Sequence, residues 1–171
     1  MILSVHALMG AAVASLVPAH PVWGFTLGFA SHLVLDAIPH RDYHLLSVAF
    51  DAEKKPTAFN ALHERLDLLR DVSLVAGDAL AGLGLAFIFF VNFDYPWAFL
   101  FGALGSLLPD FLTFLYIIFK HKTLAAFLRL HSGLFHSKIS LGLDDAAGVL
   151  LQFLTVAILI MALFGLRRLL F

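Results

Sequence analysis

A histidine and a carboxylate stand four residues apart in an apolar segment near the start of the chain, at His32 and Asp36. Positions i and i+4 of an α-helix lie on one face, so the two side chains can act together. Pro39 ends the helix because the residue before a proline avoids the α conformation. His40 follows it and can fold back toward the same pair. Imidazole and carboxylate groups side by side suit metal ligation or proton transfer.

The composition describes the surroundings of these groups. Of the 171 residues, 61% are hydrophobic and 13% are charged, and the mean hydropathy is +0.92. Soluble domains have about 45–50% apolar and about 25% charged residues, so the chain is predicted to be an integral membrane protein. The net charge of −1 gives no reason to expect a nucleic acid partner. The lack of cysteine excludes disulfides, thiolate metal sites and a cysteine nucleophile.

Hydropathy divides the chain into five apolar segments that are predicted to be helical spans. They cover residues 2–17, 22–38, 72–91, 97–119 and 141–166. Between the second and the third, Thr57 can cap a helix whose apolar residues, from Phe59 to Leu69, recur at helical spacing. This helix either lies on the membrane surface as an amphipathic helix or extends the third span. The predicted fold class is all-α: a polytopic helical bundle that forms a single transmembrane domain over residues 1–171.

The lysines and arginines are distributed unevenly over the loops. Nine lie in residues 39–71 and 120–140, which five spans put on one side, and two lie in the C-terminal tail. The nine are Arg41, Lys54, Lys55, Arg65, Arg70, Lys120, Lys122, Arg129 and Lys138. Basic loops tend to stay in the cytoplasm. A multi-pass protein of the inner (plasma) membrane with a cytoplasmic N-terminus is therefore predicted.

The sequence contains an internal similarity. The residues from Trp23 to Asp36 recur 74 positions later, from Trp97 to Asp110, with matching tryptophan, phenylalanine, glycine, leucine and aspartate. The preceding helices also match, with His6 in the place of Asp78. Two repeat units, about 2–38 and 72–119, are therefore predicted, in parallel orientation. Such a repeat would make Asp36 and Asp110 face each other.

Four polar residues lie within the apolar segments toward the predicted cytoplasmic side: His6, Asp36, Asp78 and Asp110. A charged side chain in a span costs about 2.5–3.5 kcal/mol on insertion scales. No lysine or arginine lies within the spans to pair with the carboxylates, whereas histidines and a divalent metal can compensate them. Nitrogen and oxygen ligands without sulfur favour zinc or manganese. The alternative is that each polar group only satisfies helix packing.

Two short motifs resemble those of a known family. The runs Gly105-Ser-Leu-Leu-Pro-Asp110 and His131-Ser-Gly-Leu-Phe-His136-Ser are similar to motifs of the YdjM-like bacterial inner-membrane proteins, which are described as metal-dependent hydrolases. The resemblance implies a metal site and hydrolytic chemistry. The residues that match the family's motifs are His6, His32, Asp36, Asp110, His131 and His136. The chain departs from the family at Leu112, where the family has a second aspartate.

Three functions are compatible with these residues. The leading hypothesis is a membrane hydrolase in which a divalent metal activates water for attack on an ester or phosphoester of a membrane lipid or another amphipathic substrate. The predicted metal ligands are His32, Asp36, Asp110 and His136, helped by His6 and Asp78. His131 or His40 would serve as general acid–base. The alternatives are a metal or proton transporter and a non-catalytic membrane scaffold.

Overall fold

The computed structural model describes residues 1–40, 42–43, 45–46, 61–135 and 145–170. Every regular element within them is helical, as the all-α prediction required. The α-helices are α1 (Leu3–Ala14), α2 (Pro21–Asp36), α3 (Ala61–Phe90), α4 (Ala98–Phe119), α5 (Lys122–Leu130) and α6 (Asp145–Leu170). A single π-helical turn, η1 (His131–Phe135), follows α5 directly.

Three helices are long and apolar enough to cross a membrane, which fits the predicted membrane protein. The segments are Leu66–Phe90, Ala98–Tyr116 and Ala146–Gly165. Large apolar side chains remain exposed on α3 and α6, such as Ile88 and Ile158, as expected for surfaces that face lipid. The 12 residues of α1 and the 16 of α2 are about 18 and 24 Å long, shorter than a hydrocarbon core of about 30 Å. The five-span count therefore stays a prediction.

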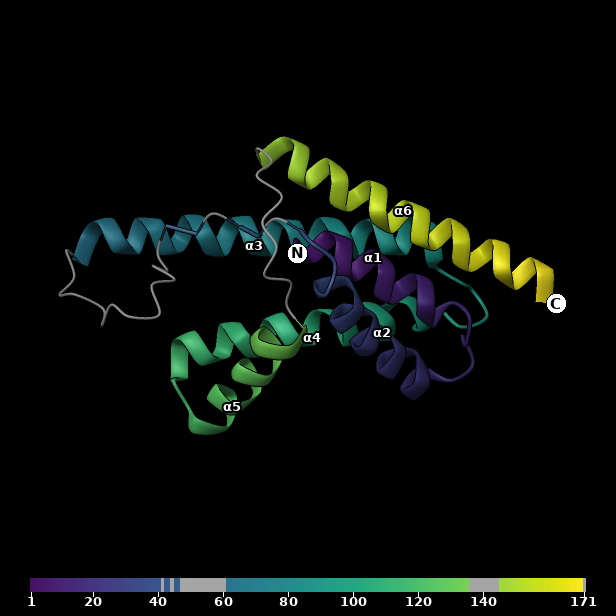
Figure 1. Cartoon of the computed structure of the whole chain (residues 1–171), viewed down its shortest axis with the longest axis horizontal. Helices are drawn as coiled ribbons and strands as arrows, with labels where there is room; N and C mark the ends of the chain where they lie inside the picture. The colour runs from purple at the N-terminus through teal and green to yellow at the C-terminus, as the bar shows by residue number, and fades with distance from the viewer. Residues whose placement is uncertain (41, 44, 47–60, 136–144, 171) are drawn as a thin grey trace.

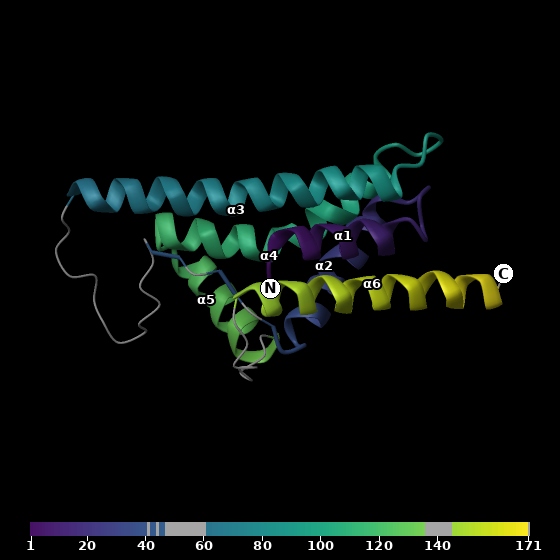
Figure 2. The ribbon, with the colours of Figure 1, turned by 90° about the horizontal axis from the view of Figure 1, so that it is seen from above.

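Helix α1 lies at the centre of the bundle and packs against α2, α3, α4 and α6 (Figures 1 and 2). Its side chains are mostly buried on all sides, which suits a sequence that is apolar all round rather than amphipathic. Small residues make this possible, since alanines 7, 11, 12 and 14 are fully buried. Small side chains let neighbouring helix backbones approach closely in a membrane.

Three glycines mark the closest approaches between α1, α2 and α4. A Cβ atom on Gly28 would lie 2.1 Å from the carbonyl oxygen of Gly102, and one on Gly102 would lie 2.2 Å from that of Gly10. No side chain fits at such distances, so the three helices meet through their backbones. Gly28 and Gly102 each precede an aspartate by eight residues, about 12 Å along the helix. The glycine contact therefore holds α2 and α4 together just before Asp36 and Asp110.

The structure decides between two open alternatives in one segment and differs from the sequence-based prediction in another. Residues 61–71 extend the third span, because α3 runs without a break from Ala61 through that span. Thr57 and Phe59 lie outside the described residues. The segment 120–140 was predicted as a loop, but α5 and η1 form in its first part. His121 caps α5 by accepting a hydrogen bond from the backbone N–H of Thr123, and this local capping was not recognised in the sequence.

The internal repeat is also still a prediction. Helices α1 and α2 pack along each other extensively, whereas α3 and α4 contact each other much less. Asp36 is almost completely buried and Asp110 is 30% exposed, so the two aspartates occupy different surroundings. The start of the predicted last span at residue 141 lies outside the described residues, and α6 is described from Asp145.

Candidate metal centre

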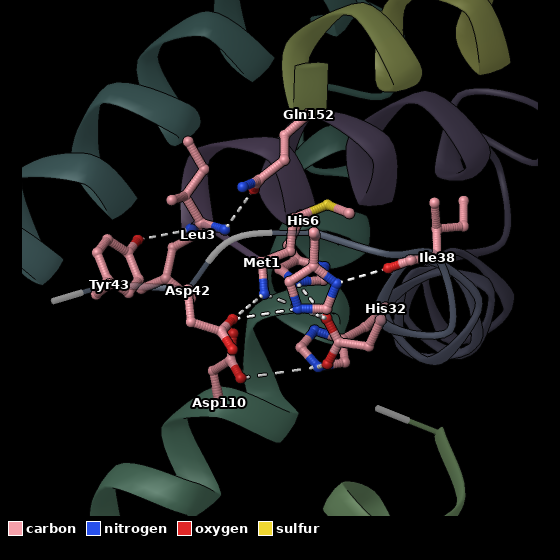
Figure 3. Close-up of polar contacts among 12 residues, drawn as sticks. Met1, Leu3, His6, His32, Ile38, Asp42, Tyr43, Asp110 and Gln152 are labelled. Atoms are coloured by element: carbon pink, nitrogen blue, oxygen red, sulfur yellow. Dashed lines mark hydrogen bonds and ion pairs between the residues drawn. The ribbon is translucent and has the colours of Figure 1, made fainter. Parts of the chain in front are cut away.

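A group of histidines and aspartates from four elements converges inside the bundle. His32 and Asp36 come from the end of α2, Asp110 from the middle of α4, and His131 from the first residue of η1. One ligand atom from each of the four lies within 4.8 Å of the others. His6 of α1 stacks on His32 with 4.0 Å between the ring centroids. Figure 3 labels His6, His32 and Asp110 in this group.

The donor atoms of the four residues are close enough together to share one cation. His32 Nε2 lies 3.0 Å from His131 Nε2 and 3.1 Å from Asp36 Oδ2, and His131 Nε2 lies 3.0 Å from the same oxygen. Asp110 Oδ1 lies 3.8 Å from His32 Nε2. Ligands at about 2.0–2.1 Å from a tetrahedral zinc stand roughly 3.4 Å apart. The group could therefore hold a single first-row divalent metal, and its nitrogen and oxygen donors suit such an ion.

The burial of the group favours a cation at its centre. The side chains of Asp36, His32 and His131 are each at most 5% exposed. The described partners of the Asp36 carboxylate are histidine rings and the Met1 ammonium. Nδ1 of His32 is buried and has no hydrogen-bond partner within the described residues. A buried carboxylate is costly unless positive charge lies beside it, and a cation bound among these donors would add to the charge of the Met1 ammonium.

The second oxygen of Asp36 faces a different set of groups. Asp36 Oδ1 lies 3.2 Å from His6 Nε2, 3.9 Å from His40 Nε2 and 3.5 Å from the Met1 ammonium. Asp42, in the segment after α2, lies 3.1 Å from His40 Nε2 and 2.8 Å from the same ammonium. Burial raises the pKa of the Asp42 carboxyl, but the His40 contact and the ammonium outweigh this effect and hold the pKa below its ordinary value. Asp36 thus joins two clusters of polar groups.

The predicted site residues are distributed as follows. His32, Asp36 and Asp110 come together, and His6 lies against them. His131, which the sequence suggested as a general acid–base, lies with its Nε2 3.0 Å from Asp36 Oδ2 and belongs to the group of four that could hold a metal. His40 is buried beside Asp36 Oδ1. His136 lies outside the described residues, so its role stays a prediction.

Asp78 contacts the start of α1 rather than the four converging residues. Its Oδ2 accepts hydrogen bonds from the backbone N–H of Ser4 at 2.9 Å and from the Tyr43 hydroxyl at 2.5 Å. It does not belong to the group of four whose ligand atoms converge. Asp78 therefore holds the first turn of α1, the helix that carries His6.

Two further residues complete this capping of α1, and sequence reasoning missed both. Gln152 of α6 accepts a hydrogen bond from the backbone N–H of Ile2 at 3.0 Å, and the Tyr43 hydroxyl accepts one from that of Leu3 at 2.7 Å (Figure 3). The first N–H groups of a helix always need acceptors from elsewhere. The sequence contained a signal for Gln152, because it is a lone glutamine in the last apolar segment. Burial, and then the hydrogen bond to Asp78, raises the pKa of the Tyr43 hydroxyl.

Comparison of the chain with models of protein families, with curated proteins and with solved structures finds no match. The contacts of the converging residues assign a cluster of four nitrogen and oxygen donors, three of them buried, to the end of α2, the middle of α4 and the start of η1.

Proposed function

We propose that the chain is an integral membrane, metal-dependent hydrolase that cleaves an ester or phosphoester of an amphipathic, lipid-linked substrate at the cytoplasmic face of the inner membrane. The observation that carries the proposal is the convergence of His32, Asp36, Asp110 and His131, with one ligand atom from each within 4.8 Å. The resemblance to YdjM-like proteins is part of this proposal and points to the same chemistry.

These four side chains would hold the metal, with zinc or manganese the cations that suit their donors. When bound, a divalent cation supplies Lewis-acid activation of water and of the scissile ester. The protein's own contribution is to orient the donors and to exclude bulk water. His32 and Asp36 do this from one turn of α2, where both are almost completely buried. The predicted ligand His136 is included in the proposal as a further donor.

The exposure of Asp110 favours a substrate that approaches from an apolar surface. Asp110 is 30% exposed, whereas His32, Asp36 and His131 are at most 5% exposed. On the same helix, Phe111 is 53% and Phe114 is 38% exposed. A carboxylate that is accessible beside exposed aromatic rings suits a molecule with a polar head and an apolar tail. A water-soluble substrate would have no apolar tail to contact the exposed rings.

Transport is less well supported than hydrolysis. A transported ion needs polar groups along the whole path. In α1 after His6, in α2 before His32 and in α4 before Asp110, the sequence contains no charged residue and no other histidine. The polar groups are therefore concentrated at one depth, as in a catalytic centre.

The proposal is tested by metal analysis and hydrolysis assays on purified protein in detergent. We expect stoichiometric zinc or manganese in the wild type, and its loss in His32→Ala, Asp36→Ala and Asp110→Ala. Hydrolysis of ester and phosphoester lipid analogues should fall at least about 100-fold in the same variants. His20→Ala, at an exposed position, is the matched control. Full metal in all three ligand variants, or metal without any hydrolysis, would contradict the hydrolase.

A further inference from the structure

Helix α5 presents one side to the rest of the molecule and the other side outward. Among the described residues it packs mainly against α4 and the adjoining η1, and it lies at the edge of the bundle (Figures 1 and 2). Leu124, Phe127 and Leu128 on its inner side are half-buried, and none of its nine residues is fully buried. The outer side of α5 is therefore uncovered within the described part of the chain.

The outer side of α5 carries basic residues. Lys122, Ala126 and Arg129 follow one another at spacings of four and three residues, which places them on one face of the helix. All three are exposed, and so is Lys120 just before the helix. We call Lys120, Lys122 and Arg129 the basic cluster of α5.

No negative charge of the described chain compensates the basic cluster. Residues 111–143 contain no aspartate or glutamate. None of the three side chains forms an ion pair with a described residue, and the Arg129 Nε–H donates to the carbonyl oxygen of Ala125 on its own helix at 3.3 Å. Arg70 of α3 differs, since it pairs with Asp71 at 3.0 Å. The basic cluster is thus available to an anion from outside the chain.

Apolar side chains beside the basic cluster indicate the kind of anion. Phe119 precedes the cluster and is 67% exposed, and Leu130 at the end of α5 is 53% exposed. The membrane-length part of α4 ends at Tyr116, shortly before Phe119, so α5 begins near the level where a span leaves the hydrocarbon core. A helix with basic and exposed apolar residues at that level suits the boundary between lipid headgroups and acyl chains. A phospholipid offers both negative charge and hydrocarbon at this boundary.

We propose that the basic cluster of α5 binds the headgroup of an anionic phospholipid, with Phe119 and Leu130 against its acyl chains. Arg129 is suited to bind the phosphate through two parallel hydrogen bonds, and the lysines attract it as point charges. Each basic residue near an anionic membrane surface strengthens lipid binding by about fivefold. This lipid is a bound partner, and its binding does not depend on hydrolysis at the metal centre. Because His131 follows α5 directly, the lipid also holds the helix that leads to this residue.

The test measures which lipid lies beside α5 in the full chain. The chain has no cysteine of its own, so Ala126→Cys can carry a single neutral bimane fluorophore. The labelled protein is reconstituted in phosphatidylcholine vesicles, to which phosphatidylglycerol or phosphatidylcholine with a nitroxide near the top of the acyl chain is added. Quenching of the fluorophore as a function of the nitroxide lipid fraction gives the relative binding constant of each lipid. We expect phosphatidylglycerol to bind beside position 126 at least about tenfold more tightly than phosphatidylcholine.

A second label position and two sets of variants serve as controls. Gly84→Cys on α3, where a side chain meets nothing within 4 Å, should show no preference between the two lipids. Lys120→Gln/Lys122→Gln/Arg129→Gln should remove the preference at position 126. Arg70→Gln should leave it unchanged, because the charge of Arg70 is already paired with Asp71.

Three results would overturn the proposal. The first is equal binding of the two lipids at position 126, and the second is a preference that survives in the triple variant. The third is quenching by neither lipid at position 126 while position 84 is still quenched, since α5 would then contact water or a protein instead. Should the triple variant fail to fold, the comparison of the two lipids at positions 126 and 84 still decides the question.

Discussion

Asp78 illustrates how a half-buried carboxylate can be satisfied without a metal. It accepts hydrogen bonds from the backbone of Ser4 and from the Tyr43 hydroxyl. The Ser4 N–H is one of the first of α1, where a helix carries partial positive charge that favours an anionic neighbour. The residue that the sequence suggested as a helper ligand thus fixes the helix that carries His6. Its effect on the centre is indirect, through the position of α1.

Tyr43→Phe should lower the free energy of unfolding by about 1 kcal/mol, because it removes the hydroxyl that bridges Leu3 and Asp78. The raised pKa of Tyr43 also predicts a pH effect. In the unfolded chain a tyrosine ionises near its ordinary pKa of about 10. The native hydroxyl ionises only at higher pH, so the stability it contributes is complete below about pH 10 and is lost as the pH rises further.

An absorbance titration at a tyrosinate wavelength checks this pH effect. The most alkaline ionisation step of the wild type should be missing in Tyr43→Phe and present in Tyr95→Phe, whose tyrosine is 45% exposed in the wild type. If the step persists in Tyr43→Phe, it does not belong to the Tyr43 hydroxyl, and the predicted rise in the pKa of that hydroxyl is wrong.

At the level of helices, the backbone contact among α1, α2 and α4 determines whether the centre can assemble. Asp36 and Asp110 belong to different helices and are 74 residues apart in sequence. They meet because Gly28 and Gly102 allow α2 and α4 to touch. Any side chain at this contact has to push the two helices apart, and packed interiors transmit such displacements.

Gly28→Ala should therefore reduce both stability and metal binding. Its Cβ atom would lie 2.1 Å from a backbone oxygen of Gly102, which cannot rotate away, and overpacking of this kind costs about 1–3 kcal/mol. Thermal unfolding in detergent and metal content are the measurements. Gly84→Ala is the matched control, because a Cβ atom there meets nothing within 4 Å and alanine favours helix. Equal melting temperatures and metal contents for the two variants would rule out the backbone contact as a determinant of the site.

At the level of the whole molecule, the ends of the helices can be compared with the distribution of basic residues. The N-terminal end of α3 and the turn between α4 and α5 lie at one end of the bundle, and the segment 91–97 that joins α3 to α4 lies at the other (Figure 1). Lys120 and Lys122 lie at the first end, while Asp94 is in the joining segment. This distribution favours a cytoplasmic location for the first end.

Single cysteines can test this orientation, because the chain has none of its own. A cysteine at Lys122 should resist a membrane-impermeant thiol reagent in intact cells and react after permeabilisation. A cysteine at Asp94 should react in intact cells. Both positions are exposed, so burial does not limit either reaction. Labelling at position 122 alone in intact cells would reverse the predicted orientation.

Local patterns in the sequence were sufficient for part of this description. The helical class and the three long apolar helices follow from hydropathy, since a helix in lipid has to satisfy its own backbone and present apolar side chains. The pairing of His32 with Asp36 follows from helical periodicity alone, and the 3.1 Å contact agrees with it. Asp110 and His6 were recognised because polar groups are rare in apolar segments.

Only the tertiary structure decided which of these groups meet. His131 lies 95 residues from Asp36 in sequence and touches it, while Asp78 is taken up by the first turn of α1. Gln152 and Tyr43 also accept hydrogen bonds from that turn, and they lie far from it in sequence at no helical spacing. Each of these contacts depends on how closely helices cross. The crossing is set by the fit of small residues on several helices at once, and hydropathy and spacing along one helix do not contain that information.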